Sequence, residues 1–234
     1  SRNLGVQAAK YDIVVFLTQD AVLVDKYTVE HLIRCFNDRT IGCAFGRQLP
    51  QFGATFFSKF ARLNNYGKES YIRTFADRKK YGMKTCFISN SFAAYRKKAI
   101  NEVGGFPTNT ILSEDMYVAA KMLIHGWKIA YNADSKVFHS HNYSIWQEFK
   151  RYFDIGVFHS RESWIREKFG GAEGEGIHFI KKEIKVIFKN NPFFIIEMIL
   201  RDGMKFIGYR LGRTEKILPI KLKRHISMNK EYWG

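Results

Sequence analysis

Three acidic side chains in the sequence could carry acid–base or metal chemistry. Asp20 follows the apolar run 13–17, and the carboxyl ends of strands are where open α/β sheets bind ligands. Glu114 and Asp115 begin a predicted helix, whose positive amino-terminal dipole favours an ionised carboxylate that could serve as a general base. The residues alone leave two alternatives open. Asp20 could be an ordinary loop or capping acid, and the Glu114–Asp115 pair could simply complement the helix dipole.

His139 and His141 form the second group that could do chemistry. They are two residues apart at the end of a predicted strand, so their imidazoles are expected on the same face. Two such histidines can bind a metal ion, although a pair of this kind is more often structural or merely exposed. The other five histidines have no comparable partner along the chain, and we assign them no role.

Alternating strand and helix patterns precede His141 and must position these residues. Residues 13–17 predict a central strand buried on both faces, and residues 25–38 predict a helix with apolar side chains at offsets 0, 3, 4 and 7. We expect strands at 41–49 and 85–95, with helix and loop over 52–80 covering a cleft. A helix that starts after Ser113 and ends at Gly126 is followed by predicted strands at 129–131 and 137–141. This alternation indicates an α/β fold.

The remainder of the chain, from residue 145, is predicted to be mainly helical. Its helices are expected to break at the glycine-rich loop 170–176 and at Pro192. We therefore predict two parts, residues 1–142 and residues 143–234. The aromatic side chains of the second part could face an anionic membrane, or could form the core of a helical cap or a dimer interface.

Composition narrows the class of protein. The 234 residues are 46% hydrophobic and 26% charged, which argues against a collagen, a disordered tail or a multidomain assembly. Three cysteines without a CxxC pair indicate reduced thiols in a cytoplasmic protein, and argue against a zinc finger or a disulfide-rich domain. The longest apolar stretch, 192–200, contains Glu197 and is too short to span a bilayer. No secretory signal is expected in the first residues.

The net charge of +16 predicts an anionic partner: nucleic acid, an anionic membrane face or a phosphate-bearing substrate. No RNP motif, zinc spacing or helix-turn-helix is recognisable, so we expect no nucleic acid. A non-enzymatic polyanion or nucleic-acid binder is the alternative that charge alone would support.

Taken in order, seven short segments resemble family 2 inverting glycosyltransferases of the GT-A fold, a Rossmann-like mixed sheet. The resemblance covers about residues 1–160, and its details are most similar to bacterial rhamnosyltransferases of cell-surface polysaccharide synthesis. The family's amino-terminal nucleotide-binding βαβ portion has no counterpart here, so the first part resembles the carboxyl-terminal part of the catalytic domain. The matching segments are SRNLG (1–5), FLTQDA (16–21), SNS (89–91), GGF (104–106), SED (113–115), GWKI (126–129) and VFHSH (137–141).

The resemblance implies a divalent cation, Mg²⁺ or Mn²⁺, held at the diphosphate of a sugar nucleotide. Asp20 matches the last acid of the family's DxD motif, and His139 matches the histidine that completes the metal site. Gln19 stands where many members have another acid, so the site has fewer carboxylates than usual. Arg2 and Asn3 match a segment near the nucleotide, and with Gln19 they are the implied donor-binding residues.

On the acceptor side, Asp115 matches the family's catalytic base, so the resemblance implies this role for it. Asn90, Glu114 and His141 would line the acceptor site. The implied enzyme is a hexosyltransferase, best matched by a rhamnosyltransferase, that moves a sugar from a nucleoside diphosphate to a lipid-linked saccharide.

Such an enzyme would work as a peripheral cytoplasmic protein at the inner face of the plasma membrane. It could also form a homodimer. A degenerate transferase that acts as a scaffold is the second alternative.

Overall fold

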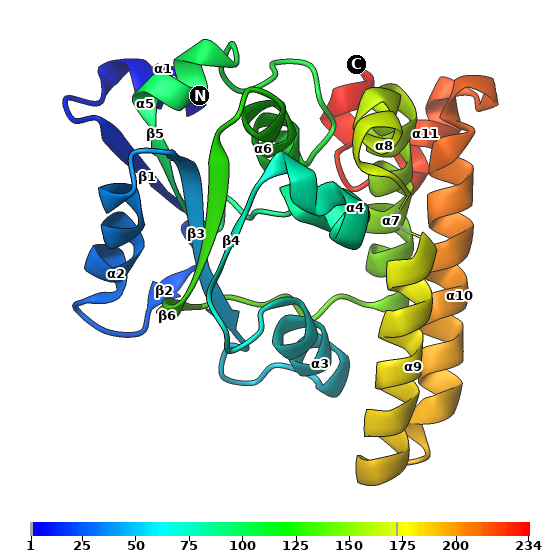
Figure 1. The fold of residues 1–234 in the computed structure, drawn as a ribbon. Coiled ribbons are helices and arrows are strands. Elements are labelled where there is room, and N and C mark those ends of the chain that lie inside the picture. Colours follow the sequence, from blue (N-terminus) through cyan, green and yellow to red (C-terminus); the bar gives the residue numbers. More distant parts are fainter. Residues whose placement is uncertain (1, 172) are drawn as a thin grey trace. The chain divides into compact units, whose positions relative to one another are not determined.

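The structure of the chain, a computed structural model, describes residues 2–171 and 173–234. The chain divides into two compact units. The first contains residues 1–108 and 114–142, and the second contains residues 109–113 and 143–234. The first unit is built on a mixed β-sheet, and the second is helical (Figure 1).

The first unit holds a six-stranded sheet in the order β1-β5-β3-β6-β2, with β4 also paired to β6. β3 and β6 are parallel, whereas β5 is antiparallel to both β1 and β3. The carboxyl ends of β1, β3 and β6 therefore meet at one edge of the sheet. The strands are β1 (Ile13–Leu17), β2 (Val22–Leu23), β3 (Ile41–Leu49), β4 (Tyr71–Arg73), β5 (Phe92–Arg96) and β6 (Lys128–Phe138).

Helices flank the sheet and complete the core of the first unit. Leu32 and Phe36, from the amphipathic pattern at 25–38, are buried with Ile41, Phe92 and Val137 of the strands. The α-helices of this unit are α1 (Arg2–Ala8), α2 (Thr28–Arg34), α3 (Phe56–Asn65), α4 (Arg78–Tyr81), α5 (Lys97–Glu102) and α6 (Glu114–Ile124).

Three of the predicted strands differ from the observed ones. The strand expected at 85–95 is only β5, because residues 82–86 form a 3-10 turn. The strands expected at 129–131 and 137–141 are one strand, β6. The Asn132 side chain accepts hydrogen bonds from the backbone N–H groups of Asp134 and Ser135, and the register with β3 shifts there. The polar residues between the two predicted strands form a bulge within β6.

In the part of the chain that the structure describes, the second unit contains five α-helices. Breaks occur where they were expected, because α8 ends before Gly170 and Pro192 separates α9 from α10. The loop expected over 170–176 is shorter than predicted, because α9 already begins at Glu173. Among the described residues, no helix combines the length and apolarity needed to cross a bilayer. The helices are α7 (Ile145–Arg161), α8 (Ser163–Phe169), α9 (Glu173–Asn190), α10 (Phe194–Arg213) and α11 (Ile220–Ile226).

Glycines allow α7 and α10 to approach closely. A Cβ atom on Gly208 would overlap the carbonyl oxygen of Phe149, and a Cβ atom on Gly212 would overlap that of Phe153. Gly156 of α7 lies against Gly212 in the same contact. The two helix backbones therefore touch at positions where any side chain would push them apart.

The substitution Gly212→Ala should lower the free energy of unfolding by roughly 1–3 kcal/mol, the usual cost of overpacking a close contact. Gly203→Ala on the same helix is the matched control, because nothing lies within 4 Å of the Cβ it would add. That control should raise stability by about 0.5–1 kcal/mol through helix propensity. Urea unfolding measures both changes. Equal stabilisation by the two substitutions would contradict the close approach of α7 and α10.

Candidate functional site

Asp20, His139 and His141 form a cluster at the sheet edge where β1 and β6 end. Asp20 lies in a turn after β1, and both histidines directly follow β6. The distance from Asp20 Oδ2 is 3.3 Å to His139 Nε2 and 3.9 Å to His141 Nδ1. One ligand atom from each of the three residues lies within 4.8 Å of the other two. The cluster thus offers two imidazole nitrogens and a carboxylate oxygen to a cation.

Gln48 and Arg62 orient the His139 ring. His139 Nδ1 is 3.0 Å from Gln48 Oε1, and that oxygen also accepts a 2.7 Å hydrogen bond from the guanidinium of Arg62. The Arg62 guanidinium can only donate hydrogen bonds, so the oxygen of the Gln48 side-chain amide must face it. Because that oxygen accepts hydrogen bonds, His139 Nδ1 must carry a proton to donate to it. The lone pair of neutral His139 is consequently on Nε2, directed at Asp20.

The electrostatics of the cluster favour a neutral histidine beside an ionised aspartate. Burial and the charge of Arg62 lower the pKa of His139 to about 4. Burial works against the charge on Asp20, but neighbouring Thr18, His139 and His141 outweigh it, so the pKa of Asp20 falls below its usual range. At neutral pH an imidazole lone pair therefore faces a carboxylate oxygen. Two such acceptors repel each other unless a cation lies between them, so this donor set fits a divalent metal ion.

Asp115 belongs to a second group, at the start of α6. Its Oδ2 accepts a 3.0 Å hydrogen bond from the backbone N–H of Asn90, and its Oδ1 accepts a 2.8 Å hydrogen bond from that of Met116. The side chain keeps some exposure, yet its carboxyl group is desolvated. Burial, followed by the charge of Glu114, raises the pKa of Asp115 to about 6. A carboxylate of this basicity can accept a proton near neutral pH.

Glu114, beside Asp115, is already engaged by other residues. It pairs with Arg2 at 2.9 Å and accepts a hydrogen bond from the side chain of Asn90 at 3.4 Å. The Asn90 amide oxygen in turn accepts a 2.6 Å hydrogen bond from Tyr95. Because Glu114 is already held by Arg2 and Asn90, Asp115 is the better placed of the two acids to accept a further proton.

The two remaining residues predicted to bind the donor lie in different surroundings. Asn3 hydrogen-bonds the backbone of Phe106 in both directions, at 2.9 and 2.8 Å, and so fastens α1 to that loop. Gln19 is exposed next to Asp20 in the turn after β1. The structure therefore brings Arg2 to the Asp115 group and leaves Gln19 beside the Asp20 cluster. Their roles in donor binding stay predictions.

Hydrogen bonds through Gln48, together with the backbone between Ser89 and Asn90, connect the two groups. The Gln48 side chain accepts from His139 through its oxygen and donates to Ser89 Oγ at 2.9 Å, and Ser89 immediately precedes Asn90. Sequence reasoning missed Gln48 and Arg62. The available signal was a glutamine in the mostly apolar strand 41–49, where a buried polar side chain needs partners.

Comparisons with known proteins agree on one family. The profile described as glycosyl transferase family group 2 matches residues 13–153. The chain is 48% identical over 235 residues to the O-antigen chain rhamnosyltransferase WbaN of Salmonella anatum, and 47% identical to the O-antigen chain rhamnosyltransferase RfbN of Salmonella typhimurium. Each match covers the whole chain and 75% of the relative.

A solved structure with a similar fold is the mannosyltransferase PcManGT of Pyrobaculum calidifontis, in complex with GDP-Man and Mn²⁺. The two chains are 14% identical with a TM-score of 0.55, and the match covers 92% of this chain and 66% of the mannosyltransferase. This likeness confirms the predicted α/β fold of the GT-A type.

Proposed function

The chain belongs to glycosyl transferase family group 2 and is a glycosyltransferase; from this premise we propose that it moves rhamnose from a nucleoside-diphosphate sugar to a lipid-linked saccharide. One observation carries the proposal. The Asp115 carboxyl group, whose pKa is raised, and the cluster of Asp20, His139 and His141 lie at one edge of the sheet and are connected to each other. The choice of rhamnose, and of a cell-surface polysaccharide as product, is supported by the names of the two Salmonella relatives.

In this proposal Asp115 removes the proton from the acceptor hydroxyl as the oxygen attacks the anomeric carbon. The nucleoside diphosphate leaves from the opposite face, so one displacement inverts the anomeric configuration. A diphosphate is a good leaving group and needs no acid to protonate it, in contrast to the alkoxide that leaves in glycoside hydrolysis. Hydrogen bonds from the backbone of Asn90 and Met116 hold the Asp115 carboxylate in place.

Asp20 and His139 would hold a divalent cation, and we assign His141 to the same site rather than to the acceptor side. The distances within the cluster support this assignment. When bound, the cation would supply positive charge that stabilises the departing diphosphate. Gln48 and Arg62 keep the His139 lone pair directed at the site. The Mn²⁺ in the mannosyltransferase of similar fold is further support for a cation.

The alternative of a non-enzymatic polyanion binder rested on net charge alone, and family membership does not support it. The positive charge agrees better with a diphosphate-bearing donor and a lipid-linked acceptor. We place such an enzyme at the inner face of the plasma membrane, as a peripheral protein that functions alone or as a homodimer.

The proposal is tested by offering the full-length protein a panel of sugar nucleotides, including dTDP-rhamnose, with a lipid-linked saccharide and Mn²⁺. We expect transfer from dTDP-rhamnose to exceed transfer from the other donors. Efficient transfer from a different sugar would overturn the choice of rhamnose. No transfer from any donor, with an intact fold, would support the alternative of a degenerate transferase that acts as a scaffold.

The pKa of Asp115 predicts the acid limb of the pH profile. Because the base must be ionised, kcat/KM should fall about tenfold per pH unit below about pH 6 and level off above it. A carboxyl group with a raised folded-state pKa stabilises the fold at low pH and loses that contribution as the pH rises through 6. Acidification therefore does not unfold the protein through this group.

Transfer rates measured between pH 4.5 and 8, with circular dichroism at each pH, check this prediction. A rate that stays constant down to pH 5 in the folded protein would contradict Asp115 as the titrating base.

A further inference from the structure

One face of α10, together with Phe193 immediately before the helix, carries large apolar side chains that the second unit does not cover. Six of them are between 48% and 88% exposed. They recur at spacings of three, four and seven residues, so they form one stripe along the helix. A continuous exposed apolar surface of this kind usually marks a contact site. We call these residues the apolar stripe: Phe193, Ile196, Ile199, Leu200, Phe206 and Ile207.

The neighbouring helix α9 adds a row of positive charge beside more apolar side chains. Lys181, Lys182, Lys185 and Lys189 are all exposed, and among the described residues none of them has an acidic partner in an ion pair. They repeat along one side of α9, and we call them the lysine row. Ile177, Ile180 and Phe188 of the same helix are also exposed.

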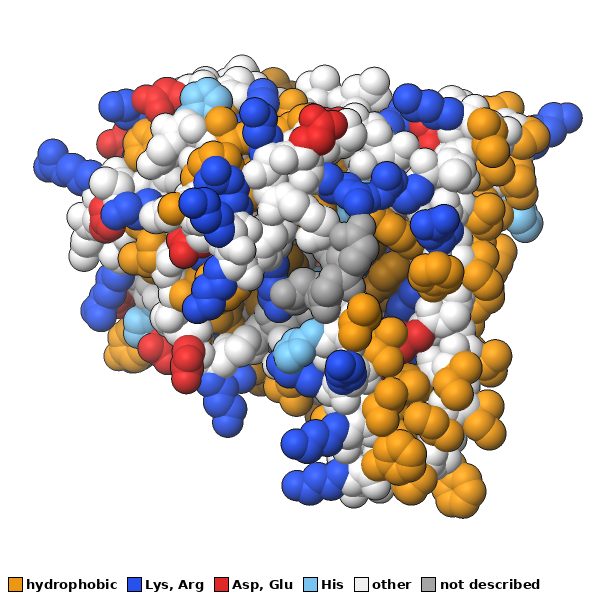
Figure 2. Space-filling model, turned by 45° about the vertical axis from the view of Figure 1, so that its right-hand side comes forward, with side chains coloured by type: hydrophobic (Ala, Val, Ile, Leu, Met, Phe, Trp, Pro, Cys, Tyr) orange, Lys and Arg blue, Asp and Glu red, His pale blue; other side chains and the backbone are white. Residues whose placement is uncertain are grey.

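Buried contacts determine which side of α9 faces outward. Ile187 is fully buried, and Glu183 is buried next to Asp202 of α10, whose negative charge adds to burial in raising the pKa of Glu183. Since these two residues face inward, the lysine row and the apolar side chains of α9 must lie on its outer sides. Figure 2 shows hydrophobic side chains gathered over the lower parts of α9 and α10, with Lys and Arg side chains along one edge.

We propose that the α9–α10 hairpin lies in the interface of an anionic lipid membrane. The apolar stripe would enter the boundary between headgroups and acyl chains, and the lysine row would contact the lipid phosphates. This combination of an apolar face and flanking lysines is the chemistry that interfacial helices use. The residues of the second unit from 143 onward also include 18 basic and 11 acidic side chains, so the whole unit is attracted to negative charge.

A second copy of the chain fits this surface less well than lipid does. A symmetric contact through the hairpin would bring two lysine rows toward each other, and the described part of α9 offers no acidic row to neutralise them. Anionic headgroups supply the missing negative charge. The inference rests on the proposed function in one respect only: a lipid-linked acceptor would require the enzyme to bind the membrane that contains it.

The test is cosedimentation of the full-length protein with phosphatidylcholine vesicles that contain or lack phosphatidylserine. We expect binding to the anionic vesicles that weakens as salt is raised. Replacing the lysine row with glutamine should weaken that binding by roughly 10²-fold or more. Replacing Phe193, Ile196 and Phe206 with serine should also abolish most of it, because the buried apolar area is lost.

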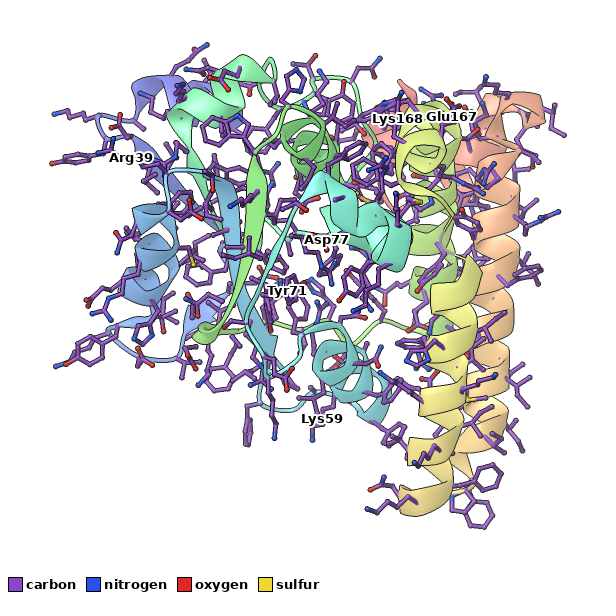
Figure 3. The ribbon with its side chains drawn as sticks, viewed as in Figure 1. Arg39, Lys59, Tyr71, Asp77, Glu167 and Lys168 are labelled. Atoms are coloured by element: carbon purple, nitrogen blue, oxygen red, sulfur yellow. The ribbon has the colours of Figure 1, made fainter. Side chains whose placement is uncertain are left out.

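Matched controls come from the first unit. Lys10, Lys26, Lys59 and Lys68 are exposed, and their joint replacement by glutamine removes the same charge; Lys59 is labelled in Figure 3. Phe52→Ser with Ile72→Ser removes exposed apolar side chains outside the hairpin. Both controls should bind anionic vesicles almost as the unaltered protein does. Circular dichroism verifies that each variant is folded.

Three results would overturn the proposal. The first is no binding to anionic vesicles, and the second is equal weakening by the control and hairpin variants. The third is a dimer in sedimentation equilibrium that the serine variant dissociates, which would assign the stripe to a second copy. Transfer to a water-soluble saccharide acceptor should be unchanged in the hairpin variants. That assay separates a failure of docking from a failure of the proposed transferase activity.

Discussion

Replacing Asp115 with asparagine should lower the rate of sugar transfer by roughly two to four orders of magnitude, the usual contribution of a positioned base. Asparagine keeps the size of the side chain and can still accept a hydrogen bond from the backbone of Asn90 or Met116. It lacks the basic lone pair, so the acceptor hydroxyl would have to attack without losing its proton to the enzyme. Donor affinity should change little, because the substitution affects proton removal.

The fold of this variant should survive. The charge of Asp115 at the start of α6 contributes only about 0.3–1 kcal/mol through the helix dipole. Burial and Glu114 already disfavour that charge, as its raised pKa shows. Thermal unfolding and single-turnover rates, measured on the same preparation of the full-length protein, distinguish lost chemistry from lost structure.

Glu114→Gln is the matched control for Asp115→Asn. Glu114 is next in the chain and is paired with Arg2, so its removal changes charge at the same place without removing the proposed base. We expect a smaller loss of transfer than for Asp115→Asn. Near-normal turnover in Asp115→Asn, or a larger loss in Glu114→Gln, would contradict the role of Asp115 and make Glu114 the next candidate for the base.

The second large effect is expected from Asp20→Asn at the carboxylate–imidazole cluster. Asp20 is the single carboxylate of the cluster, and its replacement removes the negative charge that faces His139 and His141. Binding of Mn²⁺ should weaken strongly. Transfer should fall by about 10²-fold or more, because a metal ion contributes several kcal/mol of charge stabilisation and each 1.4 kcal/mol is worth a factor of ten.

Electron paramagnetic resonance of free Mn²⁺, with and without a nucleoside diphosphate, measures the affinity independently of activity. Asp12→Asn is the control, since Asp12 is an exposed acid just before β1 and lies outside the cluster. It should leave Mn²⁺ affinity unchanged. If Asp20→Asn binds Mn²⁺ as tightly as the unaltered protein, Asp20 is a loop acid and the cation role fails.

Local patterns were enough to predict most of the elements. The β-branched run at 13–17 and the helical spacing after Ser113 correspond to β1 and α6. The run was expected to be a central strand buried on both faces, but β1 lies at the edge of the sheet and is only partly buried, because strand order is decided by pairing with distant segments. Gly170 and Pro192 mark the breaks between helices of the second unit, since these residues interrupt a helix locally. The expected loop 170–176 was too long, because Gly174 and Gly176 lie within α9. The short strand β4 was missed because three residues carry too little periodicity to be recognised.

Other features depend on residues that are far apart in the chain. The bulge at Asn132 joins two predicted strands into β6, and it exists because residues on both sides pair with β3. The close approach of α7 and α10 likewise joins distant segments: Gly208 and Gly212 lie four residues apart on one face of α10, but their partner Gly156 is about fifty residues earlier in the chain. Each of these features is a contact between segments, so periodicity within one segment cannot reveal it.

The sequence by itself determined the α/β class, the family resemblance, and the choice of Asp20, Asp115 and His139 as residues to consider. Only the tertiary structure brought His141 close to Asp20 and paired Glu114 with Arg2. It also placed the Gln48 side chain, hydrogen-bonded to Arg62, against the His139 ring. The physical reason is that residue types and short-range spacing limit which chemistry is available. The orientation of a lone pair and the basicity of a carboxylate depend on hydrogen bonds and burial, which exist only after distant strands and helices have packed together.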